Sequence, residues 1–210
     1  MRRREKFVIT SILLSLGLWS LQLIQLEFRY IGVALFTLLT YGASAWSLKE
    51  DLQRFEWLTI LPFPALYAAS VGLFYFLLPE GFLSRLFSLG LFGIGMYGLL
   101  LTSNIYSVAK GRTIQLVHAA HAVGLLFTLI TSLLLTNTIF SLRLPFYWNA
   151  LLVGLSHAPL IGMSIWAVNL EQRVTREVLS LAGILTLIII ELAIVFSLFP
   201  LSVWNVALLI

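Results

Sequence analysis

Seven apolar runs of about 20 residues follow one another along the chain, and the short segments between them hold most of the charges. An α-helix rises about 1.5 Å per residue, so about 20 apolar residues cross the roughly 30 Å hydrocarbon layer of a bilayer. The sequence therefore predicts an all-α, polytopic transmembrane helix bundle that forms a single transmembrane domain over residues 1–210. The predicted spans are 7–26, 30–48, 58–79, 86–108, 114–137, 148–169 and 178–199.

Composition excludes several other classes of protein. The chain is 60% hydrophobic and only 10% charged, whereas a soluble domain carries about 25% charged residues to cover its surface. The absence of cysteine excludes disulfides, thiolate metal sites and thiol catalysis. Because the basic residues lie between apolar runs, we expect membrane lipids and other membrane subunits as partners and no nucleic acid. No cofactor is expected, since no cofactor-binding motif appears.

The distribution of basic residues predicts the orientation. With the N-terminus in the cytoplasm, ten of the 13 Lys and Arg residues fall inside and three fall outside. This asymmetry is typical of multi-pass proteins of the cell membrane, and a missed or additional span would destroy it. The inside set is Arg2, Arg3, Arg4, Lys6, Lys49, Arg54, Lys110, Arg112, Arg173 and Arg176, and the outside set is Arg29, Arg85 and Arg143.

Two proline-containing segments leave alternatives open. Residues 201–210 are apolar but about half the length of a span, and they follow Pro200, which ends a helix. They are either a partial eighth span, which the sequence favours, or a re-entrant or interfacial stub. In the third span, Pro62 and Pro64 either begin the helix, where a missing N–H costs nothing, or kink it; the first interpretation is favoured.

Glu191 is the one acidic residue of nine that falls inside a predicted span. A carboxylate at such depth costs a few kcal/mol and needs a partner. His157 of the preceding span is the predicted partner, since the two residues lie about 2 Å and about 4 Å outside the midplane by helical rise. Consecutive helices joined by a short loop usually pack together.

Pro159 adds a second feature to this predicted site. Proline has no N–H, so the carbonyl of Leu155 loses its helical hydrogen bond. Glu191, His157, Leu155 and Pro159 therefore form the candidate ligand or proton site. The alternative is a structural His–Glu hydrogen bond that holds two helices together, and the sequence favours neither interpretation strongly.

A secondary polar cluster is predicted toward the cytoplasmic side. His118 and His121 share a helix face at i,i+3 spacing, and Asn104 and Ser103 lie at comparable depth in the preceding span. The cluster either opens as a polar cavity or places two histidines among headgroups. The three histidines differ too much in depth to hold one metal ion, so no metal site and no catalytic residue are predicted.

Three functions of different classes are compatible with these features. The first, marginally favoured, is a non-catalytic membrane subunit or scaffold whose buried polar residues specify packing. The second is a small transporter or permease-like protein with a midplane site at His157 and Glu191. The third is an intramembrane enzyme that acts on lipid-linked substrates near His118 and His121; short loops and the absence of a catalytic motif weigh against it.

Overall fold

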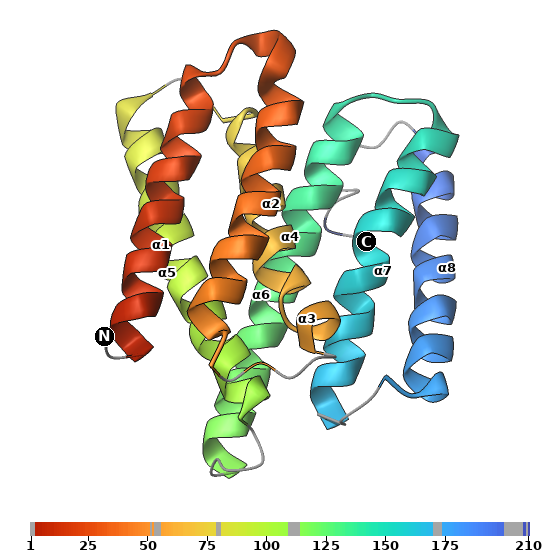
Figure 1. Cartoon of the computed structure of the whole chain (residues 1–210). Helices are drawn as coiled ribbons and strands as arrows, with labels where there is room; N and C mark the ends of the chain where they lie inside the picture. Colours follow the sequence, from red (N-terminus) through yellow and green to blue (C-terminus); the bar gives the residue numbers. More distant parts are fainter. Residues whose placement is uncertain are drawn as a thin grey trace. The chain divides into compact units, whose positions relative to one another are not determined.

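A computed structural model describes residues 3–50, 52, 56–78, 81–108, 114–169, 174–199, 208 and 210 (Figure 1). The chain divides into two compact units, residues 1–127 and residues 128–210. The boundary between the units falls inside the helix α6 (Ile114–Ser141).

Unit 1 is built from four long helices, the first half of α6 and one short helix. The helix α1 packs against both α5 and α2, and α4 packs against α2 and α5. Two single turns of 3₁₀-helix, Leu21–Leu23 and Leu26–Phe28, connect α1 to α2. The helices of this unit before α6 are α1 (Arg3–Ser20), α2 (Arg29–Leu48), α3 (Glu56–Thr59), α4 (Pro62–Tyr75) and α5 (Phe82–Ser107).

An aromatic cluster joins four helices of unit 1. The ring of Phe92 in α5 lies 6.0 Å from that of Phe36 in α2 and stacks at 5.6 Å on Tyr67 of α4. Tyr67 also meets Phe127 of α6 edge-on at 5.4 Å. Offset and edge-on contacts of this kind add about 0.5–1.5 kcal/mol per pair beyond the area they bury, so the cluster fixes the core of the unit.

The prolines of the third predicted span begin a helix. The helix α4 starts at Pro62, with proline in its first turn, and the four-residue helix α3 precedes it. The favoured interpretation is therefore confirmed, because the first turn of a helix has N–H groups without helical partners and loses nothing to proline.

Unit 2 contains the second half of α6, α7 (Phe146–Asn169) and α8 (Arg176–Leu198). Its core joins Ile139 and Phe140 of α6 to Val153 of α7 and Ala193 of α8. A Cβ at Gly154 in α7 would lie only 2.6 Å from the side chain of Ile190 in α8. The absence of a side chain at this position therefore lets α7 and α8 pack closely.

The all-helical prediction is confirmed for the described part of the chain, which contains no strand. Six helical segments there are long and apolar enough to cross a membrane: α2, α3 with α4, α5, α6, α7 and α8. The helix α1 is not among them, since its first four residues are charged. Residues 201–207, the basic residues Arg2, Arg54, Lys110, Arg112 and Arg173, and residue 209 lie outside the described set.

Candidate functional site

His157 is buried in unit 2 and hydrogen-bonded through both ring nitrogens. Nδ1 lies 2.9 Å from the carbonyl oxygen of Val153, one turn earlier in α7. Since a carbonyl only accepts, Nδ1 carries a proton and donates it. On the other side, Nε2 lies 2.9 Å from the hydroxyl of Ser132 and 3.3 Å from that of Thr136, both in α6. The imidazole therefore joins α6 to α7 and uses both of its nitrogens.

A hydroxyl group of α7 itself also lies beside this ring. Ser156 donates to the Val153 carbonyl at 3.1 Å, and its oxygen lies 3.1 Å from Nδ1 of His157. Seven residues after His157 in α7, Ser164 forms a hydrogen bond with Thr128 of α6 at 3.3 Å. Hydrogen bonds between helices thus recur along the α6–α7 contact in unit 2, and His157 is the largest polar side chain among them.

Glu191 does not contact His157. Glu191 is exposed on the surface of α8, whereas His157 is 2% exposed and bonded to α6 and to its own helix. The prediction considered the depth of His157 and Glu191 along their helices but not the direction of each side chain around its helix. The buried stripe of α8 includes Ala193, and Glu191 lies two residues before it, about 200° around the helix at 100° per residue. The expected His157–Glu191 contact is therefore absent from the described structure.

Leu155 and Pro159 also lie apart from the imidazole. The side chain of Leu155 is 73% exposed, two residues before His157 and hence on the opposite face of α7. Pro159 lies inside α7, which continues as one helix from Phe146 to Asn169. Of the four residues of the candidate site, only His157 is in the interior of the unit.

The secondary cluster divides into buried and exposed members. Ser103 and Asn104 are 2% and 5% exposed in α5. His121 of α6 lies with its ring 5.6 Å from that of Tyr106, and its Nε2 is buried without a hydrogen-bond partner among the described residues. His118 is exposed, and its ring lies 6.4 Å from that of His121.

Glu56, which is not among the residues predicted from the sequence, is buried in unit 1 at 3% exposure. Its carboxylate accepts a hydrogen bond of 2.7 Å from the hydroxyl of Ser107 at the end of α5. The neighbouring carbonyl of Trp57 accepts from the hydroxyl of Tyr41 in α2 at 2.8 Å. The short helix α3 is thus tied to both α2 and α5. The available signal was an acidic residue directly before an apolar run, where it occupies the first turn of a helix.

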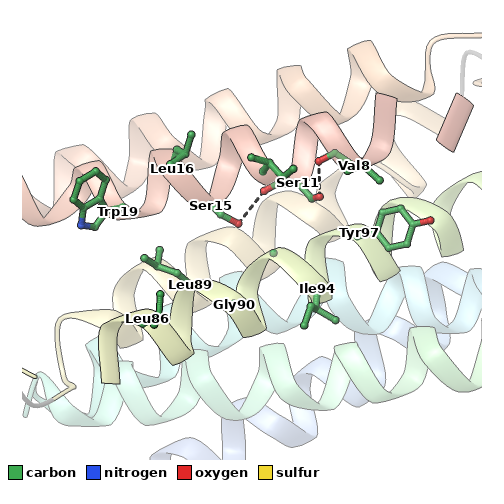
Figure 2. A pocket seen from close by; sticks show the side chains of 12 residues that line it. Val8, Ser11, Ser15, Leu16, Trp19, Leu86, Leu89, Gly90, Ile94 and Tyr97 are labelled. Atoms are coloured by element: carbon green, nitrogen blue, oxygen red, sulfur yellow. Dashed lines mark hydrogen bonds between the residues drawn. The ribbon is translucent and has the colours of Figure 1, made fainter. Parts of the chain in front are cut away.

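A groove runs between α1 and α5 in unit 1, with a volume of about 530 Å³. Figure 2 shows Trp19 and Leu86 toward one end and Val8 and Tyr97 toward the other. The hydroxyls of Ser11 and Ser15 donate at 2.9 Å to carbonyls of their own helix. The groove therefore offers an occupant mainly hydrocarbon and places no charged side chain in its lining.

In the described part of the chain, no three His, Cys, Asp or Glu side chains are close enough to hold one metal ion. The class that fold and composition define is a membrane-embedded helical protein. Comparisons with protein families, with curated proteins and with solved structures gave no match to this chain. The function is therefore inferred from the geometry alone.

Proposed function

We propose that this chain is a non-catalytic subunit or scaffold of the cell membrane that crosses the bilayer seven times, with its N-terminus in the cytoplasm. The observation that carries the proposal is the bonding of His157. A proton or ligand site needs a group that can exchange its partners, but both nitrogens of this ring are held by hydroxyls and a backbone carbonyl. Buried polar networks of this kind specify which helix faces meet.

The packing of α1 on α5 supports α1 as a seventh span. A Cβ at Gly93 of α5 would touch the hydroxyl of Ser15 in α1 at 2.7 Å, so these two residues lie at one depth. Counted from that contact, Lys6 and Arg85 lie at opposite ends of the antiparallel pair, about 26 Å apart by helical rise. That separation is close to the roughly 30 Å thickness of the hydrocarbon layer. Seven spans also agree with the asymmetry of basic residues.

The proposed topology is testable because the chain has no cysteine of its own. Single cysteines at Leu142, between α6 and α7, and at Val174, before α8, are expected to differ in their access to a membrane-impermeant maleimide. In intact cells Leu142→Cys should be labelled, and Val174→Cys only after the cells are opened. Labelling of both or of neither in intact cells contradicts this topology.

The role of a subunit is tested by the size of the complex in the membrane. The tagged chain, extracted in a mild detergent and run on a native gel, is expected in a complex that contains another membrane protein. Loss of the chain should lower the abundance of that protein. A lone monomer, combined with solute or proton flux into proteoliposomes that His157→Asn abolishes, would overturn the proposal in favour of a transporter.

Membrane lipid is the proposed occupant of the groove between α1 and α5. The hydroxyls that line the groove are already bonded to their own helix, so an occupant needs no hydrogen-bonding group. The indole of Trp19 and the phenol of Tyr97 have the apolar bodies and polar tips that suit a bilayer-facing surface.

A further inference from the structure

The outward side of α8 carries a single carboxylate in an apolar stripe. Around Glu191, every third or fourth residue is a large apolar side chain between 44% and 60% exposed. This spacing places them on one helix face. We call this surface the outer face of α8, and it consists of Ile184, Leu187, Ile188, Glu191 and Val195.

The polar groups of α8 that lie within its apolar length are directed to the opposite side. Thr186 donates to the carbonyl of Ala182 at 2.6 Å, and Ser197 donates to that of Ala193 at 2.7 Å while accepting from Asn149 at 3.1 Å. None of these groups reaches Glu191, and no hydrogen bond to its carboxylate is found among the described residues. The described residues of unit 2 therefore provide no hydrogen-bond donor for Glu191.

Glu191 lies too far from either end of α8 for its carboxylate to reach the water outside the apolar segment. By helical rise it lies about 22 Å from Arg176 at the start of α8 and about 10 Å from Leu198 at its end. A glutamate side chain is too short to span 10 Å, whereas lysine and arginine have long stems that carry a charge along an apolar surface. A partner with a long cationic side chain can therefore meet Glu191 at this depth.

Gly183 provides room for such a partner. It is exposed in α8, and a Cβ added there would meet nothing within 4 Å. Gly183, Leu187 and Glu191 follow one another at i,i+4 spacing, so they form one line along the helix. A small residue on this line lets a neighbouring helix approach closely.

We infer that the outer face of α8 binds a transmembrane helix of another membrane protein, which places a Lys or Arg side chain against Glu191. The inference rests on the proposed role as a membrane subunit and names the chemistry of its partner. Charge complementarity selects the cation, because ionisable groups within membranes are found paired with one another. A symmetric contact with a second copy through this face would instead bring two carboxylates together, which disfavours their charged forms.

The test uses synthetic transmembrane peptides of defined sequence in liposomes. Each peptide is a 20-residue Leu/Ala helix with one central residue, either Lys, Asn, Glu or Leu. Binding is measured by energy transfer to a dye on Phe199→Cys, at the end of α8. The Lys peptide is expected to bind at least tenfold more tightly than the Leu peptide, and Glu191→Gln should abolish this preference.

Two glycine variants separate the docking surface from general effects on the helix. Gly183→Leu should weaken binding of the Lys peptide at least tenfold. Gly42→Leu makes the same change in α2, at a position that also has nothing within 4 Å, and should leave binding unchanged. Equal effects of both variants would overturn the assignment of the surface.

Other outcomes overturn the inference in distinct ways. Equal binding of the Lys and Leu peptides removes the role of charge, and equal binding of the Asn and Lys peptides shows that a neutral donor suffices. Preference for the Glu peptide, or energy transfer between copies of the chain, replaces the partner by a second copy. If the native complex is found but the protein shows no preference for the Lys peptide, this inference fails and the proposed subunit role stands. If no native complex is found, the proposed subunit role fails whatever the peptides show.

Discussion

Glu56 lies at the start of a long apolar segment and Glu191 lies within one, yet the first side chain is buried and the second is exposed. In unit 1, Glu56 is buried at the start of α3 and accepts a hydrogen bond from Ser107, which follows it by 51 positions in the chain. In unit 2, Glu191 lies within the apolar helix α8, closer to its end than to its start, and is exposed. The first carboxylate is compensated by the fold of its own chain. The carboxylate of Glu191 points to the surroundings of α8 and not into unit 2.

The difference in burial determines how each carboxylate affects the stability of its unit. Removing a buried and hydrogen-bonded carboxylate destabilises a unit, because the groups that it bonded are left unsatisfied. A carboxylate directed into hydrocarbon adds nothing to that stability and costs roughly 2.5–3.5 kcal/mol at the centre of a spanning helix on insertion scales. The interaction that we infer for Glu191 is therefore with a partner outside the fold.

The largest expected effect comes from removing each carboxylate in turn. Glu56→Ala should destabilise the protein by about 2–3 kcal/mol, since a hydrogen bond to a buried charged group is lost. Glu191→Leu should leave the free energy of unfolding unchanged or raise it. Unfolding in mixed micelles with increasing SDS measures both variants. Equal destabilisation by the two substitutions contradicts the contrast between them.

A smaller effect is expected from filling the contact between α7 and α8. Gly154→Leu places new atoms against Ile190 and should destabilise by about 2 kcal/mol, which is typical of overpacking. Gly183→Leu, on the exposed line of α8, is the matched control and should have little effect on unfolding. If Gly154→Leu is tolerated as well as Gly183→Leu, the close approach of the two helices is not needed for stability.

The smallest effect belongs to the bond between His157 and Ser132. A double-mutant cycle with His157→Phe and Ser132→Ala should give a coupling energy of about 1 kcal/mol, within the range measured for hydrogen bonds between membrane helices. Unfolding of the two single variants and the double variant supplies the cycle. A coupling energy near zero means that the bond does not hold α6 to α7.

The helices of this protein follow closely from its sequence. The predicted spans 30–48 and 178–199 correspond to α2 (Arg29–Leu48) and α8 (Arg176–Leu198), because apolar length alone selects a helix in a bilayer. Pro62 likewise marks the start of α4, where proline has a local physical reason to occur. Features that depend on one helix at a time were therefore predictable.

The candidate site required information about more than one helix. Depth along the membrane normal placed His157 and Glu191 together, but a contact also depends on the direction of each side chain around its helix. The small and hydroxyl residues Ala182, Thr186 and Ala193 mark the packing face of α8, and they point away from Glu191. That pattern was present in the sequence and could have shown that Glu191 faces outward.

Glu56 shows a limit of another kind. It lies two residues before the predicted span 58–79, and the predicted buried carboxylate was chosen from residues inside the spans. Its burial depends on Ser107, at the far end of a different helix, and no local pattern links the two residues. The pairing of distant helices within unit 1 determined this contact.

The apolar length of α8 has a consequence for how the protein is made. The helix is the most apolar of the six spanning segments, and each Leu or Ile near its centre favours insertion by roughly 0.3–0.6 kcal/mol. The run of three isoleucines, Ile188 to Ile190, directly precedes Glu191. Together with the other Leu and Ile residues of α8, these isoleucines offset the cost of the carboxylate when the helix enters the bilayer. For the partner helix that we infer, this means that α8 can be in the membrane before the two proteins meet.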